Sequence, residues 1–322
     1  MVLALAVPAA AAQPTRSSPI AVAADGHVFV VNPDSSTVAR LEFDGVGTGT
    51  LTHEQRVGRY PRTVALVGSH VFTADQGEDS VSRLAQADLT DPRRVDLGFG
   101  CNPYGIAAVP GGHGVVATCQ GTSEAVLLDE DLGVVARVKL PWPDARAVAV
   151  SSDGARAYVT HYLTAEPGLD AHVSVVDLAQ KAVAQVLAIP ADQTTCETTG
   201  SGQGVFNLVS AAVLMPDDAP ADVAGQLWLG GELENAVSKG LFKREPSLAT
   251  QPGAALFPWV RFTPFPDGAT SRNIYHASAH DLVRSAIYRI DPRAGTVVGK
   301  LDLDGTSIAT DIELSADGRA QC

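Results

Sequence analysis

Two arginines and a tyrosine recur along this chain at one interval, because Arg62, Tyr104 and Arg146 are each 42 residues apart. If the interval is that of a structural repeat, the three side chains lie together on one rim of the fold. Guanidinium groups bind carboxylates and phosphates through paired hydrogen bonds. The spacing therefore predicts a site for a small anion. The alternative is that these side chains cap strand ends and bond neighbouring carbonyl groups.

A second set of polar residues falls in the loops between the second and third predicted strands of each repeat. In a closed arrangement of repeats these loops share a face with Arg62, Tyr104 and Arg146, and functional residues concentrate in such loops. We therefore expect a ligand or a partner on this face. The loop residues that we expect to contact it are Asn32, Asp75, Gln120, His161 and Glu232.

Motifs for metals, cofactors and covalent catalysis are weak or missing in the sequence. His276 and His280 share a face only on a helix, and a metal site would need both together with His161 and a carboxylate, a combination that scattered histidines rarely form. The carboxylates of Glu232 and Glu234 suit acid–base work or calcium, but loop carboxylates are mostly solvated. There is no Cys-x-x-Cys-His haem motif, no phosphate loop and no nucleophile elbow. We expect no catalytic residue, no metal and no cofactor in this chain.

The repeat itself predicts the elements that position these residues. A similar five-residue motif recurs every 42 residues, in Pro19–Ala23, Pro61–Ala65, Pro103–Ala107 and Ala145–Ala149. Each copy is followed by a turn, two further apolar runs and a polar loop. Four short strands in about 40 residues are typical of a β-propeller blade. We therefore expect an all-β propeller of four-stranded antiparallel blades, with five blades and the start of a sixth.

The expected blades lie near 19–60, 61–102, 103–144, 145–206 and 207–305, followed by a partial blade at 306–322. The fifth blade is interrupted by an insertion at about 232–284. Long insertions of this kind are usually functional loops or disordered excursions. The sixth blade stops after its first strand, which favours a fragment of a longer protein over an unusual five-bladed ring.

Parts of the repeat resemble the YVTN-type propeller family. The resemblance rests on His27–Asn32 followed by Thr37–Leu41, on Ala145–His161 and on His172–Asp177, and it extends over most of 19–205 and 285–320. It implies a seven-bladed parent. Similar repeats occur in bacterial surface and periplasmic proteins and in lactonase-like enzymes. They also occur in propellers joined to c-type cytochrome or dihaem peroxidase-like domains.

The resemblance leaves two alternatives to a binding or scaffold module. One is a lactonase-like hydrolase or isomerase that uses the axial arginines with a loop carboxylate or histidine. The other is the docking domain of a haem protein whose haem lies beyond Cys322. Because fold does not determine function, we expect an exported binding module whose partner is a protein or a small anion.

Composition narrows the classes of partner. The chain has 322 residues, 45% of them hydrophobic, and a net charge of −13. Such acidity argues against nucleic-acid binding and against docking on anionic lipid. Residues 1–18 are expected to be a signal-peptide remnant or a disordered tail, since Met1–Gln13 is apolar and ends in small residues. No stretch is long enough to span a membrane. We expect a periplasmic, cell-surface or extracellular protein.

Two of the four cysteines flank one predicted hairpin. Cys101 and Cys119 stand on either side of the turn at Pro110–His113, so folding back brings them to the same end of the blade. In an oxidising compartment they can form a disulfide. The alternative is a pair of buried free thiols.

Overall fold

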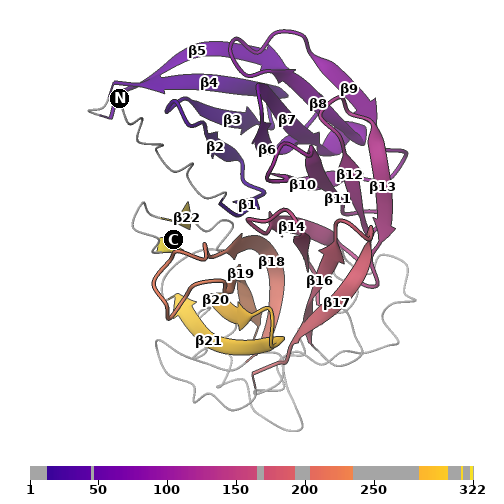
Figure 1. Cartoon of the computed structure of the whole chain (residues 1–322), viewed down its shortest axis with the longest axis vertical. Helices are drawn as coiled ribbons and strands as arrows, with labels where there is room; N and C mark the ends of the chain where they lie inside the picture. The colour runs from indigo at the N-terminus through magenta and orange to yellow at the C-terminus, as the bar shows by residue number, and fades with distance from the viewer. Residues whose placement is uncertain are drawn as a thin grey trace, which may run out of the picture.

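The computed structural model describes residues 13–44, 47–164, 170–192, 204–234, 283–303, 313–314 and 320–321. In these residues the regular structure is β, apart from one short 3-10 turn at Gln76–Glu78. Five antiparallel sheets follow one another along the chain and fan around a common centre (Figure 1). The predicted all-β fold of four-stranded antiparallel blades is confirmed.

Each blade takes four consecutive strands in simple up-and-down order. Blade 1 contains β2 (Ile20–Val22), β3 (Val28–Asn32), β4 (Thr37–Phe43) and β5 (Gly49–Arg56). Blade 2 contains β6 (Pro61–Val67), β7 (His70–Asp75), β8 (Ser80–Ala85) and β9 (Arg93–Asp96). Blade 3 contains β10 (Pro103–Ala108), β11 (Val115–Cys119), β12 (Glu124–Leu128) and β13 (Val134–Lys139).

Blade 4 contains β14 (Ala145–Val150), β15 (Arg156–His161), β16 (Ala171–Asp177) and β17 (Ala182–Ile189). Blade 5 contains β18 (Val205–Leu214), β19 (Leu227–Glu234), β20 (Val283–Asp291) and β21 (Thr296–Leu303). A two-stranded sheet of β22 (Glu313–Leu314) and β23 (Ala320–Gln321) follows. The insertion expected inside blade 5 falls between β19 and β20, and His276 and His280 lie outside the described residues.

The hydrophobic core lies between neighbouring blades rather than within one sheet. Phe29 and Val31 of blade 1, for example, pack with Val71 and Leu84 of blade 2. These strands are rich in β-branched and aromatic residues because both faces of an interior blade are covered. Full burial of each large side chain contributes roughly 2 to 3 kcal/mol. The outermost strands are more exposed and more polar, as in β5, Gly49–Arg56.

Threonine hydroxyl groups join three of the blades to the inner strand of the blade that follows. Thr63 donates to the carbonyl of Tyr104 at 2.7 Å, and Thr118 donates to the carbonyl of Arg146 at 2.5 Å. Thr160 donates in the same way to the carbonyl of Val209 at 3.1 Å. Each bond crosses from one blade to the next. Two of them fix the backbone at residues that the sequence singles out as candidate ligands.

A short N-terminal segment crosses the centre of the ring, and we refer to Pro14–Ser18 as the axial strap. Within it β1 (Thr15–Arg16) pairs antiparallel with β14 and adds a fifth strand to blade 4 (Figure 1). Ser17 donates its amide to Val148 at 2.8 Å, and Ser18 forms an isolated bridge with Val64 of blade 2. Residues 1–12 of the expected tail lie outside the described residues, whereas the strap is part of the packed centre.

Candidate binding site on the axial face

Arg62, Tyr104 and Arg146 occupy equivalent positions, as the second residues of β6, β10 and β14. The guanidinium carbon of Arg146 lies 3.6 Å from the ring centroid of Tyr104 and 3.8 Å from that of Tyr162. The guanidinium carbon of Arg62 lies 5.8 Å from the same Tyr104 ring. The structure thus brings the three recurring residues together and adds Tyr162. Arg146 is held between two aromatic faces, a favourable arrangement for a cation.

Two glutamines connect the arginines. Arg62 donates its Nε to Oε1 of Gln76 at 2.6 Å, and Arg146 donates Nη1 to Oε1 of Gln120 at 3.3 Å. Gln76 in turn donates Nε2 to Oε1 of Gln120 at 3.4 Å. A continuous chain of hydrogen bonds therefore runs from one guanidinium to the other. This chain sets the separation of the two cations before any ligand arrives.

The charge of these arginines is not balanced by a described ion pair. Within the part of the chain that the structure describes, neither Arg62 nor Arg146 lies within 4.0 Å of a carboxylate oxygen. Burial lowers the pKa of Arg146, and the charge of Arg62 adds to that effect, while Tyr104 and Tyr162 oppose it. An arginine in a protein stays protonated nonetheless. The Nε atom of Arg146 is buried without a described hydrogen-bond partner.

Two carboxylates stand at the edge of this cluster. Burial raises the pKa of Asp144, and the charge of Arg146 opposes that rise. Glu232, on β19, is buried, and its charge helps to raise the pKa of Tyr162, for which burial is the main cause. Asp144 interacts electrostatically with Arg146, and Glu232 with Tyr162. Two guanidinium groups and two carboxylates therefore share this face, in a chain that is acidic overall.

Asp75 and His161 lie inside their blades, although the sequence places them on this face. Asp75 accepts hydrogen bonds from Thr73 at 2.8 Å and from Ser82 at 2.5 Å, and burial raises its pKa to about 6. His161 donates Nδ1 to the carbonyl of Pro143 at 2.7 Å, and Nε2 accepts from the hydroxyl of Ser174 at 2.8 Å. Burial lowers the pKa of His161 to about 4.

The residues that reach the cluster lie one position further along the chain than the sequence predicts. Asp75 and His161 end the second strands of their blades, and successive side chains on a strand point to opposite sides. The next residues, Gln76 and Tyr162, therefore join the cluster in their place. Asn32 likewise bonds within its own blade, donating Nδ2 to Thr37 at 3.2 Å. Gln76, Gln120 and Tyr162, which join the cluster, each stand directly after the second strand of a blade.

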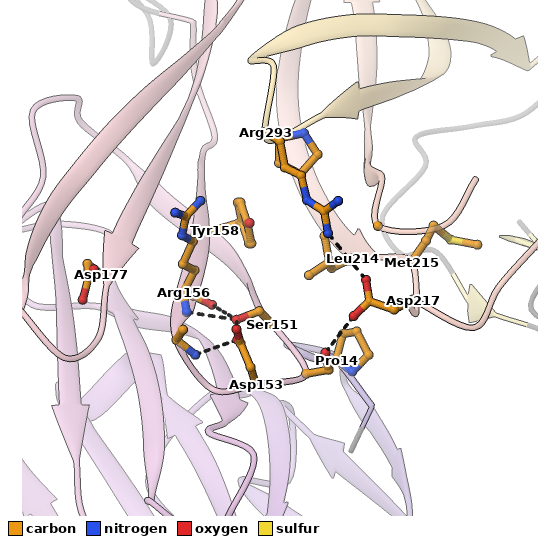
Figure 2. Close-up of a pocket in the computed structure, with 14 residues that line it drawn as sticks. Pro14, Ser151, Asp153, Arg156, Tyr158, Asp177, Leu214, Met215, Asp217 and Arg293 are labelled. Carbon is orange, nitrogen blue, oxygen red and sulfur yellow. Dashed lines mark hydrogen bonds and ion pairs between the residues drawn. The ribbon is translucent and has the colours of Figure 1, made fainter. Parts of the chain in front are cut away.

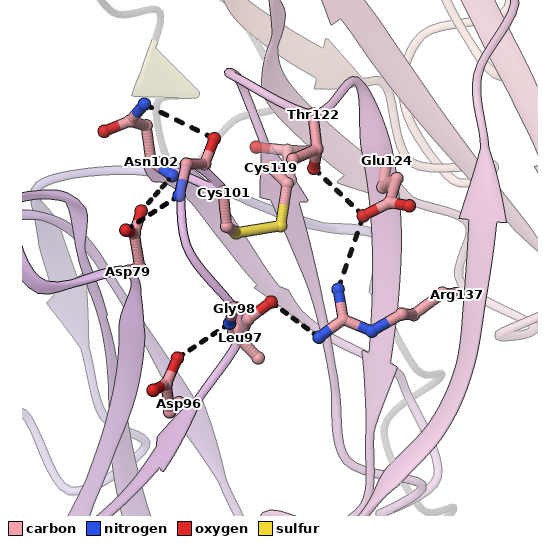
Figure 3. The surroundings of a disulfide bond; sticks show 12 residues. Asp79, Asp96, Leu97, Gly98, Cys101, Asn102, Cys119, Thr122, Glu124 and Arg137 are labelled. Carbon is pink, nitrogen blue, oxygen red and sulfur yellow. Dashed lines mark hydrogen bonds and ion pairs between the residues drawn. A yellow bond between two sulfur atoms is a disulfide. The ribbon is translucent and has the colours of Figure 1, made fainter.

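The expected disulfide is present and lies beside the site. Cys101 and Cys119 are bonded and fully buried (Figure 3). Cys119 directly precedes Gln120, and Cys101 lies three residues before Tyr104. The amide groups of Gly100 and Asn102 donate to the carboxylate of Asp79 at 2.9 and 2.7 Å. The bridge therefore ties together the two segments of blade 3 that carry site residues.

Comparisons with known proteins concern the fold. The sequence matches no protein-family model and no curated protein. Among solved structures, hydrazine synthase of Kuenenia stuttgartiensis is 14% identical over 99% of this chain and 75% of its own, with a TM-score of 0.62. A Bacteroides fragilis protein provisionally assigned as a 6-phosphogluconolactonase is 16% identical over 93% and 74%, with a TM-score of 0.55. The chain is a β-propeller.

A third similar structure supports the same conclusion. An inactive variant of virginiamycin B lyase from Staphylococcus aureus, solved with quinupristin, is 11% identical over 95% of this propeller and 83% of its own chain, with a TM-score of 0.52. Identities this low show the fold alone. The described residues of the propeller contain no helix long and apolar enough to cross a membrane. They also contain no group of three or more His, Cys, Asp and Glu residues placed to hold a metal ion.

Proposed function

We propose that this propeller is an exported binding module whose axial face holds a small organic carboxylate or phosphate between Arg62 and Arg146. The observation that carries the proposal is the position of Arg146, stacked between Tyr104 and Tyr162 with no described carboxylate partner. A partly buried cation without a counter-ion is costly. An anionic ligand supplies the missing charge, and the glutamine chain already holds the two guanidinium groups in place.

Binding without chemistry is the function that this face supports best. A lactonase-like reaction needs a general base within hydrogen-bonding distance of the substrate. Two of the sequence candidates for that role, Asp75 and His161, are enclosed in their blades with satisfied hydrogen bonds. A haem-docking role depends on residues beyond this chain, and no described contact favours it. Export agrees with the disulfide, because disulfides persist in oxidising compartments.

Isothermal titration of the whole chain with citrate and with inorganic phosphate tests the proposal. Arg146→Gln and Arg62→Gln should each weaken binding by at least tenfold, because a hydrogen bond to a charged group contributes roughly 1.5 to 3 kcal/mol. Arg146→Lys should weaken binding by nearly the same factor, because lysine keeps the charge but lacks the planar guanidinium group that stacks on the tyrosines. Arg93→Gln, on the outer strand β9, is the matched control. Equal affinities for all four variants contradict the proposal.

The same titration distinguishes a free anion from an acidic side chain of a partner protein. A free small anion gives measurable heat with citrate or phosphate alone, and the affinity falls as salt rises. If neither probe binds at millimolar concentration while the protein remains folded, a small-molecule site is ruled out. The remaining hypothesis is then that the arginines bind an acidic side chain of a partner protein.

A further inference from the structure

A second concave site lies on the opposite side of the propeller from the arginine and tyrosine cluster. It is a cavity of about 480 Å³ between blades 4 and 5 (Figure 2). Ser151, which follows the last residue of β14, lines it, whereas Arg146 stands at the start of that strand. Pro14 of the axial strap forms part of the wall. The volume is in the range of small-molecule sites, about 300 to 1,000 Å³.

Two guanidinium groups reach this cavity from different blades. Arg156 comes from β15 and Arg293 from the turn after β20, and Figure 2 shows Tyr158 between them. Burial raises the pKa of Tyr158, and the charges of both arginines oppose that rise, so both act on the same hydroxyl group. Arg156 has no described ion pair, and Arg293 has only a 3.9 Å contact with Asp217. The three groups form a donor set suited to a carboxylate.

Three carboxylates share the same cavity, those of Asp153, Asp177 and Asp217. Against two guanidinium groups they give the lining a net charge of −1. A ligand that is only an anion therefore meets net repulsion, and a ligand that is only a cation meets two arginines. Asp153 is engaged with Ser151 at 2.6 Å and with the amide of Ala155 at 2.9 Å. Among the described residues, Asp217 accepts a hydrogen bond from Ser152 at 3.3 Å and makes the long contact with Arg293.

An apolar surface completes the lining. Leu214 ends β18, the inner strand of blade 5, and Met215 follows it; both line the cavity and are largely buried, as is Tyr158. Apolar walls that surround a few converging polar groups are typical of small-molecule sites. The cavity thus offers cationic donors, anionic acceptors and an apolar wall to one ligand.

We infer that this cavity is a second binding site, for a zwitterion of the amino-acid or short-peptide class that carries a carboxylate, an ammonium group and an apolar side chain. The carboxylate meets Arg156, Arg293 and the Tyr158 hydroxyl group. The ammonium group meets Asp217, and the apolar side chain lies against Leu214 and Met215. Because the site shares no residue with the axial face, its ligand is independent of the anion proposed there.

Isothermal titration with leucyl-leucine, its N-acetyl derivative and its C-terminal amide tests this inference. The zwitterion should bind, and each capped form should bind at least tenfold more weakly, because each lacks one of the two charges. Arg156→Gln and Arg293→Gln should lower affinity for the zwitterion by a similar factor. Asp217→Asn should abolish the preference for the free amino group. Arg93→Gln, on the outer strand β9, should leave all three affinities unchanged.

Three results overturn the inference: no heat with leucyl-leucine at millimolar concentration, equal binding of zwitterion and capped forms, or unchanged affinity in both arginine variants. The two arginines lie on exposed turns and strand ends, and circular dichroism checks that each variant is folded. The inference can fail while citrate still binds through Arg146, so its failure is separate from that of the axial site.

Discussion

Replacement of the disulfide by two alanines, Cys101→Ala with Cys119→Ala, tests how the axial site is held. The bridge closes a loop with a sequence separation of 18 residues. In the loop-entropy model, removing a cross-link over such a loop costs about 3 kcal/mol. The loss of two buried sulfur atoms leaves a small void and adds about 1 kcal/mol. We therefore expect the free energy of unfolding to fall by about 3 to 4 kcal/mol.

Urea denaturation followed by tryptophan fluorescence measures this loss, and thermal denaturation gives a second reading. At about 2 °C for each kcal/mol in a chain of this size, the Tm should fall by roughly 6 to 8 °C. Titration with citrate adds a functional reading, because the bridge holds Gln120 and Tyr104 beside Arg146. The affinity of the double variant for citrate should fall at least threefold, while leucyl-leucine binding on the other face stays the same.

Reduction provides the matched control for this prediction. In the presence of a strong reductant throughout unfolding and refolding, the unmodified chain and the double variant should differ by no more than about 1 kcal/mol. A double variant as stable as the unmodified chain under oxidising conditions refutes the argument that the bridge restricts the unfolded chain. An unchanged citrate affinity refutes the argument that it positions the site.

Three further predictions concern the blade interiors. Asp75→Asn should raise stability in urea at pH 8 by up to roughly 3 kcal/mol and lose that advantage near pH 4. Because the pKa of Asp75 is raised to about 6 in the folded chain, its protonated form stabilises the fold in acid, and this stabilisation is lost as the pH rises through 6. His161→Gln should flatten the loss of stability between pH 6.5 and 4, because the pKa of His161, about 4, lies below its ordinary value. Urea titrations at several pH values show whether these two slopes have opposite signs. Thr118→Val should cost about 1 to 2 kcal/mol in urea denaturation, since it removes the bond to the Arg146 carbonyl.

The sequence is most informative where a repeat period fixes geometry. Arg62, Tyr104 and Arg146 could be predicted to meet because equal spacing on equivalent strands puts side chains at one level around an axis. The residues on the loops could not be predicted to the same accuracy. Successive side chains on a strand point to opposite sides. An error of one residue in the predicted strand end therefore selects a side chain that faces the core in place of one that faces the axial site. That exchange separates Asp75 from Gln76 and His161 from Tyr162.

One position in the repeat shows why residue type alone misleads. The last residue of the second strand is Asp75 in blade 2, Cys119 in blade 3 and His161 in blade 4. Each cross-links its own blade, through Ser82, through the disulfide and through Ser174. An acid, a thiol and an imidazole suggest three chemistries, yet all three perform one structural task. Their shared position in the repeat is a better guide than their shared reactivity.

The axial strap depends on contacts between residues that are far apart in the sequence. Ser17 and Val148 are separated by 131 positions, yet the Ser17 hydroxyl accepts from the Val148 amide at 3.0 Å. The sequence pattern did not predict this pairing, because a strand of two residues carries no periodic signal.

The distance in sequence between the strap and β14 affects the order in which the strands dock. Blades 1 to 3 can each form from neighbouring strands as the chain is synthesised, whereas the strap has no partner on β14 until blade 4 exists. Contacts over such distances form late, because the loop between them must close first. The first described strand of the chain therefore docks on β14 only after nearly half of the residues have been made.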